Sequence, residues 1–272
     1  MKRRASPAEQ LLPLRKRAAR SAPAADGRGF RPEWIDFDRG IRVGNLEPHE
    51  RITQILKLAL ESRHGTSFVI DRWGRGVYWQ WICWLPRANR EAKPLSSDVN
   101  FGCAKLFISV DQEARVFQSG LQIERGYARG PEPYPGCLLR RDWDWHRLVA
   151  QCEPESALER ELLRLLGEEG FVVQLGGFAP SVRLDASSFR SATQIREAVR
   201  RAPRREWLGF QLFYPMPEAE VRGCTGEELV SAIKATFAAV VPAMNCCLQV
   251  RLGGEPPGAD RREHRSAKPS KR

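Results

Sequence analysis

The sequence predicts an α+β domain, in which helices cover an antiparallel sheet, and three observations lead to this fold class. Four strand-like runs follow one another between residues 66 and 125, mostly joined by short turns, which is typical of antiparallel pairing. Helical periodicity lies before residue 64 and mainly after residue 142, so it does not alternate with these strands. The run at residues 77–85 is apolar on both parities, which indicates a strand covered on both faces.

The two ends of the chain differ in charge from the part between them. Residues 1–31 hold nine Lys or Arg against two Asp or Glu, a net charge of +7, and residues 251–272 hold seven against three, a net charge of +4. Residues 32–250 hold 28 of each sign and are neutral. Because both ends are also poor in aromatic residues, they cannot bury enough surface to offset their ordering entropy. We therefore expect disordered basic tails at 1–31 and 253–272 around a single α+β domain of residues 32–252.

The first half of this domain is predicted to hold one helix and four strands. The helix spans residues 48–63, where Ile52, Ile55 and Leu56 recur on one face and Gly65 is placed to end it. The predicted strands are 66–71, 77–85, 99–110 and 115–125. The last two strands form a long hairpin of about residues 99–125, which is expected to turn at residues 111–114.

The strand at residues 77–85 is rich in tryptophan. Simple alternation places Trp79, Trp81, Cys83 and Leu85 on one face. Exposed tryptophans are able to stack on nucleic-acid bases, but apolar residues on both faces favour a strand in the core.

The second half of the domain is predicted to be mainly helical. The expected elements are helices at about 142–152, 154–169, 187–202 and from 225, and strands at 171–175, 182–184 and 207–214. Thr225 and Glu228 form a capping box at the start of the last helix.

Polar residues on one face of the hairpin form the first candidate site. A turn at residues 111–114 places Lys105 opposite Gly120 and gathers Lys105, Gln122, Glu124 and Gln118 on one face. A lysine in an apolar run is costly to bury unless it is paired. A carboxylate and an ammonium on adjacent strands are able to serve as an acid–base pair. The alternative without a functional role is a solvated hairpin face with a weak cross-strand ion pair.

An arginine-rich segment forms the second candidate site. Arg196 and Arg200 lie one helical turn apart and project together. Guanidinium groups bind phosphate through paired hydrogen bonds. The candidate residues for binding phosphate or another polyanion are Arg196, Arg200, Arg201, Arg204 and Arg205. The alternative is that these arginines face the acidic segment 153–169, which holds six Glu and two Arg, or simply solvate their own helix.

Several classes of protein receive no support from the sequence. The seven cysteines are odd in number and form no CxxC pair, which favours reduced thiols and a cytoplasmic location. The four histidines have no Cys or carboxylate at ligand spacing, so no metal site is expected. The longest apolar run, 229–248, is interrupted by Lys234, Pro242 and Asn245, so no membrane span is expected. Phosphate-binding loops, dinucleotide fingerprints and nucleophile elbows are also missing.

Three functions remain open at this point. The sequence favours a soluble binding protein whose basic tails contact nucleic acid or another polyanion without sequence specificity. The alternative is an enzyme, hydrolase or nuclease-like, with its site around Lys105, Gln122 and Glu124, although no nuclease motif is satisfied because a second acidic residue at fixed spacing is missing. The third is an adaptor whose tails only confer solubility. Neither a cofactor nor an oligomeric state follows from the sequence.

Overall fold

The computed structural model describes residues 25–93, 102–125, 143–177, 180–203 and 207–253, with the backbone alone at residues 180 and 181. Most of the two predicted tails lies outside the described residues. Residues 25–31, however, belong to the folded body. Phe30 is 3% exposed, its ring centroid lies 5.6 Å from that of Trp34, and its carbonyl packs closely on Gly226. The predicted tail boundary at residue 31 is therefore too late, because a buried aromatic side chain anchors the preceding residues.

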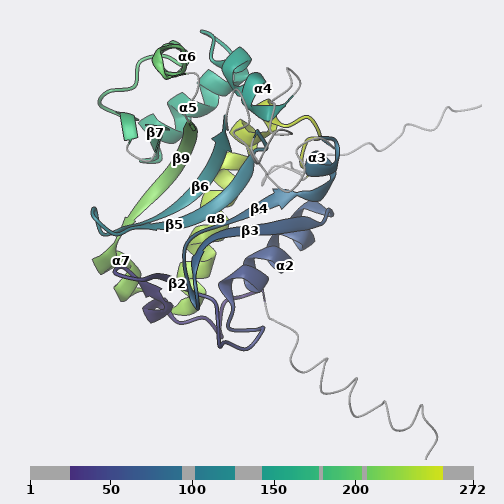
Figure 1. The fold of residues 1–272 in the computed structure, drawn as a ribbon, viewed down its shortest axis with the longest axis vertical. Coiled ribbons are helices and arrows are strands. Elements are labelled where there is room, and N and C mark those ends of the chain that lie inside the picture. Colours follow the sequence, from purple (N-terminus) through teal and green to yellow (C-terminus); the bar gives the residue numbers. More distant parts are fainter. Residues whose placement is uncertain (1–24, 94–101, 126–142, 178–179, 204–206, 254–272) are drawn as a thin grey trace, which may run out of the picture.

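The protein is an α+β protein built on one antiparallel sheet of nine strands (Figure 1). The strand order is β1-β2-β4-β5-β6-β9-β7-β8, and β3 pairs along the other edge of β4. The strands are β1 Ile35–Asp36, β2 Gly40–Arg42, β3 Phe68–Arg75, β4 Tyr78–Pro86, β5 Lys105–Asp111, β6 Val116–Glu124, β7 Val172–Gly176, β8 Pro180–Leu184 and β9 Gly209–Pro217. The hairpin β5–β6 lies in the middle of the sheet, as the sequence predicts.

Helices cover one face of this sheet, and α8 passes behind the strands in Figure 1. The helical elements are η1 Pro32–Trp34, α2 Ile52–His64, α3 Arg87–Glu91, α4 Asp144–Gln151, α5 Ala157–Gly167, α6 Thr193–Arg201, α7 Glu218–Gly223 and α8 Gly226–Cys247. The predicted capping box is present, since Thr225 and Glu228 exchange hydrogen bonds at the start of α8. The main core lies between α8 and the sheet, where Phe237 meets Trp84 edge to face at 5.7 Å.

Of the described helices, α8 is the one long and apolar enough to cross a membrane, judged by length and composition alone. Its apolar side, including Leu229, Ile233 and Phe237, is buried in the core of the protein. A long central helix of a soluble domain has the same properties.

The opposite face of the sheet, here called the open face, carries a second and smaller apolar cluster. Its buried members are Cys83, Leu85, Cys103, Phe107, Val172 and Phe213, and Trp81 packs against them. The predicted burial of β4 on both faces is therefore correct for its second half. The first four residues of β4, from Tyr78 to Trp81, are only partly buried.

The predicted common face of the β4 tryptophans is wrong. The pairing of β3 and β4 shifts by one residue, because Trp73 pairs with Trp81 while Gly74 pairs with Trp79. This bulge reverses the alternation at Gln80. As a result Trp79 packs against the main core and Trp81 against the cluster on the open face.

The register of the central hairpin also differs from the prediction. Lys105 lies opposite Gln122 instead of Gly120, and the last pair is Asp111 with Val116. The turn comes one residue later because Asp111 Oδ1 accepts a hydrogen bond from the backbone of Ala114 at 2.9 Å. Since the partner of each residue moves by two positions, every side chain keeps its predicted face.

Candidate functional site

The structure brings together the three residues of the predicted hairpin site. Lys105 Nζ lies 2.6 Å from Glu124 Oε2, across the strand pair β5–β6. Gln122 Nε2 donates to the other carboxylate oxygen, Glu124 Oε1, at 2.6 Å. Lys105, Gln122 and Glu124 are 1%, 3% and 7% exposed, so this is a buried cluster and not the solvated ion pair of the alternative interpretation.

Two neighbours that the sequence analysis did not connect to this site complete it. Trp81 Nε1 donates to Gln122 Oε1 at 2.6 Å, and Gln211 Nε2 donates to the same oxygen at 3.2 Å. The Lys105 ammonium also lies 5.3 Å from the centroid of the Trp81 ring. Trp81 lies on β4 and Gln211 on β9. Both are far from Gln122 along the chain, so their hydrogen bonds to it could not be predicted from the sequence. We call Trp81, Lys105, Gln122, Glu124 and Gln211 the central polar cluster.

The electrostatics of the central polar cluster hold its charges in place. Burial by itself lowers the pKa of Lys105, but the charge and hydrogen bond of Glu124 outweigh it and leave this pKa above its ordinary value. Lys105 therefore stays protonated and is not available as a base. Burial raises the pKa of the neighbouring Cys83 thiol well above its ordinary value, even though Lys105 opposes the change, so Cys83 is not a thiolate nucleophile. The cluster is suited to fixing the open face and poorly suited to proton transfer.

Beside this cluster, where β2, β3 and β4 meet, arginine and aromatic side chains gather on the open face. Trp73 lies opposite Trp81, and Tyr78 lies opposite both Arg42 and Arg75. Directly opposite residues share a face. The Arg39 guanidinium stacks on the ring of Tyr78, with its central carbon 4.0 Å from the ring centroid. We call Arg39, Arg42, Trp73, Arg75 and Tyr78 the arginine–aromatic patch.

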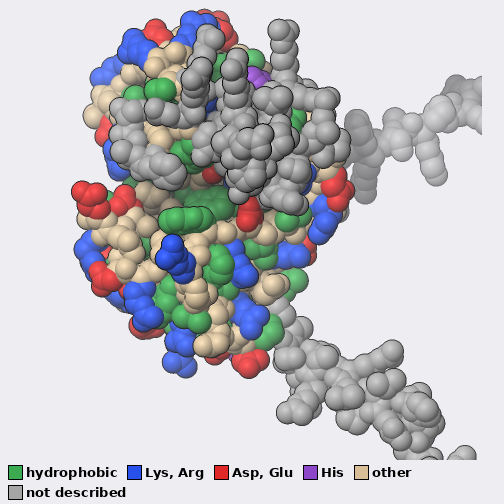
Figure 2. Space-filling view, in the orientation of Figure 1, with side chains coloured by type: hydrophobic (Ala, Val, Ile, Leu, Met, Phe, Trp, Pro, Cys, Tyr) green, Lys and Arg blue, Asp and Glu red, His purple; other side chains and the backbone are tan. Residues whose placement is uncertain are grey.

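The arginine–aromatic patch is positively charged, with Arg39, Trp73 and Arg75 exposed and Arg42 and Tyr78 partly buried. Trp73 is 68% exposed, the highest value among the exposed large hydrophobic residues of the described chain. Within the described part of the protein, none of the three arginines of the patch forms an ion pair. By contrast, Arg115 is 2.8 Å from Asp38 and 2.5 Å from Glu218. Figure 2 looks onto the open face and shows hydrophobic side chains over the middle of the sheet, with Lys and Arg side chains around them.

The surroundings of the patch carry one further stacked pair and the carboxylates of Asp36 and Asp71. Asp36 Oδ1 accepts a hydrogen bond from the backbone N–H of Arg39 at 3.0 Å. Arg72 lies next to Trp73 in β3 but on the other face of the sheet, where its guanidinium stacks 4.2 Å above the Trp79 ring. Asp71 is on the same face as Trp73 and opposite the buried Cys83. In the strand predicted at residues 77–85, Trp79 and Trp81 pack against the apolar clusters, which favours the core alternative for that strand. Trp73 lies outside that run and was not considered in the sequence analysis, and it is exposed.

The predicted arginine-rich site is only partly open to a ligand. Arg196 forms an ion pair with Glu153, as in the alternative in which acidic and basic segments face each other. Arg201 lies 3.3 Å from Glu197 on its own helix, and Arg200 is exposed. Arg204 and Arg205 lie outside the described residues. Phosphate binding by this segment stays a prediction.

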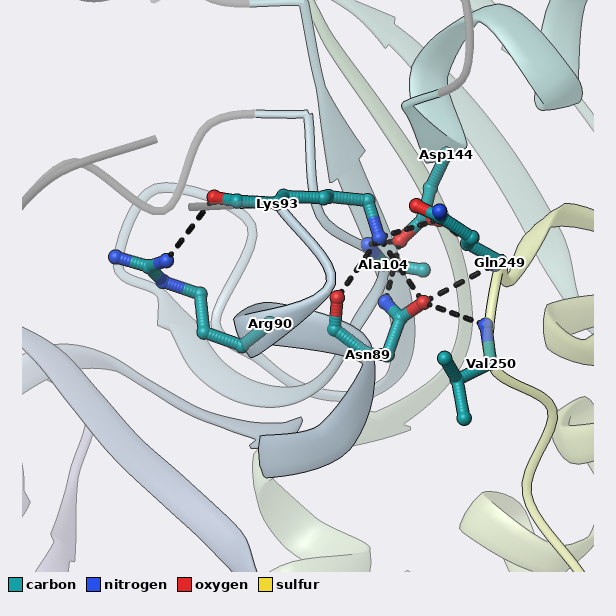
Figure 3. A network of polar contacts seen from close by, with 7 residues as sticks. All are labelled: Asn89, Arg90, Lys93, Ala104, Asp144, Gln249 and Val250. Carbon is teal, nitrogen blue, oxygen red and sulfur yellow. Dashed lines mark hydrogen bonds and ion pairs between the residues drawn. The ribbon is translucent and has the colours of Figure 1, made fainter. Parts of the chain in front are cut away.

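A second buried polar network, which sequence reasoning missed, joins α3 to α4 (Figure 3). Lys93 Nζ lies 3.0 Å from Asp144 Oδ1, and both side chains are fully buried. Lys93 also donates to the backbone and side-chain oxygens of Asn89, each at 2.9 Å. Asn89 Nδ2 donates to Asp144 Oδ2 at 2.7 Å. We call Asn89, Lys93 and Asp144 the buried clamp.

The buried clamp holds segments that are distant in the sequence. Asp144 accepts from the backbone of Ala104 at 2.8 Å, and Asn89 Oδ1 accepts from the backbones of Gln249 and Val250 at 3.0 Å. The clamp therefore ties the start of β5 and the residues after α8 to α3 and α4. Because its charges and its side-chain amide are paired within the protein, we regard it as structural.

Comparisons of the chain with protein-family models, with curated proteins and with solved structures found no match. Within the described ranges, no group of three or more His, Cys, Asp or Glu side chains is placed to hold a metal ion. Any function must therefore be argued from the surfaces described above.

Proposed function

We propose that this protein binds nucleic acid, with the arginine–aromatic patch as the folded contact surface and the basic ends adding affinity that does not depend on base sequence. The observation that carries the proposal is the set of three arginines gathered around Tyr78, namely Arg39, Arg42 and Arg75, whose guanidinium groups form no ion pair with a described carboxylate. Uncompensated arginines on one surface attract phosphates.

The distribution of charge supports this proposal. The region 32–250 is neutral as a whole, so three unpaired arginines at one place are a local excess and not part of a uniformly basic surface. The ends contribute net charges of +7 and +4. Neutralising phosphates releases condensed counterions, which makes the affinity strongly salt-dependent and insensitive to sequence.

The competing enzyme proposal receives less support from the geometry. The central polar cluster holds Lys105 and Glu124 in a mutual ion pair at 2.6 Å, with both side chains buried. A general base must be free to accept a proton from a substrate. Here the carboxylate oxygens are already occupied by Lys105 and Gln122.

The proposal is tested by removing the patch charges from the full-length protein. The triple variant Arg39→Gln/Arg42→Gln/Arg75→Gln is compared with Arg63→Gln/Lys234→Gln/Arg251→Gln, which removes three exposed cations elsewhere. Fluorescence anisotropy of a labelled oligonucleotide gives the affinity at a series of salt concentrations. We expect the patch variant to reduce the slope of log affinity against log salt by about 2 to 3, since each phosphate contact contributes about 0.7 to 0.9.

The control variant shows how much affinity is lost when three positive charges are removed away from the patch. Both variants reduce the net charge of the protein equally, so a non-specific effect of charge lowers affinity equally in both. Equal losses show that the patch is not the contact surface. Failure of the unmodified protein to bind at low salt overturns the proposed function altogether.

A further inference from the structure

We infer that the arginine–aromatic patch selects single-stranded over duplex nucleic acid, with an unpaired base stacked on Trp73. This inference rests on the proposed function and adds the class of ligand. The arginines alone attract any phosphate backbone. The exposed indole beside them is the feature that discriminates, because a stacking surface requires a base whose face is free.

Trp73 is held in an exposed position by the fold. It lies on β3, which is an edge strand, and its partner in the register is Trp81. Trp81 is fixed from below by its hydrogen bond to Gln122 and by its packing on the apolar cluster of the open face. Trp73 therefore stands beside a rigid neighbour while it remains 68% exposed itself.

The backbone next to Trp73 adopts a conformation that requires glycine. Gly74 has a φ of 153°, and a side-chain carbon at this position would lie 2.6 Å from the Cα of Trp79. Only glycine fits both constraints. The bulge at this point shifts by one residue the side-chain alternation of β4 between the two faces of the sheet. Trp73 and Arg75 of β3 and Tyr78 of β4 consequently lie on the same face. Base-stacking and phosphate-binding groups are thereby brought together.

The spacing of the patch suits a single nucleotide strand. Trp73 and Arg75 are two residues apart on the same face of β3, which corresponds to about 7 Å. An extended strand is able to place a base on the indole and an adjacent phosphate on this guanidinium. Arg39 and Arg42 lie beyond it around Tyr78, where they are placed for the next phosphates. In a duplex the base faces are covered by neighbouring bases, so only the arginine contacts remain.

A matched pair of ligands tests the inference with the full-length protein. Anisotropy titrations use a labelled oligothymidine and a duplex of the same length, at the same salt concentration. Trp73→Ala is expected to weaken binding of the single strand by about 5- to 150-fold, the range for loss of one base–aromatic stack, and to leave duplex binding unchanged. Trp73→Phe retains an aromatic face and is expected to restore most of the affinity. Leu163→Ala removes another exposed apolar side chain, which is 48% exposed, and is expected to change neither affinity.

The outcomes separate this inference from the proposed function. If the arginine variant loses affinity but Trp73→Ala binds the single strand normally, the patch binds nucleic acid and the stacking inference is overturned. If Trp73→Ala weakens binding of the single strand and of the duplex equally, the inference is also overturned, because the loss of a stack on an unpaired base would weaken only single-strand binding. If the unmodified protein binds neither ligand, the proposed function itself fails. Thermal unfolding of each variant verifies that the fold is intact.

Discussion

Replacing Lys93 with methionine removes the ammonium group from the buried clamp and leaves the carboxylate of Asp144 without its counter-charge. Lys93 Nζ lies 3.0 Å from Asp144 Oδ1, and both side chains have 0% exposure. Removing one partner of such a pair typically costs about 3–5 kcal/mol, because the remaining charge stays buried. Asp144 keeps hydrogen bonds from Asn89 and from the backbones of Ala104 and Gln249. We therefore expect Lys93→Met to lower the free energy of unfolding by about 3 kcal/mol, the lower end of this range.

The matched control is an exposed ion pair on α3, the helix that ends just before Lys93. Arg87 lies 3.7 Å from Glu91, and their side chains are 50% and 65% exposed. Solvent screens such a pair, so Arg87→Met is expected to cost less than about 1 kcal/mol. Urea denaturation measures the free energy of unfolding of each variant. In thermal unfolding, the loss expected for Lys93→Met corresponds to a fall of about 6–12 °C in Tm for a domain of this size.

A double variant separates the charge pair from the rest of the clamp. Lys93→Met/Asp144→Leu removes both charges, so we expect it to be more stable than Asp144→Leu alone, in which the Lys93 ammonium stays buried. If Lys93→Met is no more destabilising than Arg87→Met, the clamp does not carry the buried charge that its geometry indicates and the reasoning is refuted.

Three further predictions concern other parts of the fold. Gly120→Ala is expected to destabilise the protein by about 3 kcal/mol or more, because the new carbon would lie 2.0 Å from the carbonyl oxygen of Leu212 on the neighbouring strand, and urea denaturation checks this. Thr225→Ala removes the side chain that accepts from the backbone of Glu228 and is expected to cost about 1 kcal/mol in the same assay, so an unchanged midpoint contradicts the role of the cap. Burial lowers the pKa of His64 below its ordinary 6.5, against the opposing hydrogen bond to a backbone carbonyl, so the unfolded state binds the proton first. The stability that comes from a neutral His64 is therefore complete above pH 6.5 and falls as the pH drops below it. His64→Gln should show a smaller loss of stability on acidification, and an identical pH profile rules out this contribution.

The sequence was sufficient for features that depend on neighbouring residues. The capping box of Thr225 and Glu228 is set by a spacing of three residues, and it lies where it was predicted. The α+β class followed from strands that are mostly joined by short turns. The common face of Lys105, Gln122 and Glu124 followed from simple alternation along two strands, and it survived a change of register because the change was even.

The sequence was not sufficient where one residue changed the alternation or where a partner was distant along the chain. The bulge between β3 and β4 separates Trp79 from Trp81, and nothing in the run of tryptophans itself marks it. The short strands β1 and β2 were missed, because two or three residues carry too little periodicity to be recognised. The buried clamp joins Asn89 to Asp144 across 55 positions, and its residues look like ordinary polar residues in the sequence.

The sequence by itself therefore determined the class of the fold, its helix cap, the shared face of the hairpin and the contrast between a neutral body and basic ends. Only the tertiary structure decided which tryptophan is exposed, which charges are buried in pairs and which arginines are left without partners. The physical reason is the range of the interactions. Periodicity, capping and composition act between residues a few positions apart, whereas burial and charge pairing depend on which strands become neighbours in the sheet.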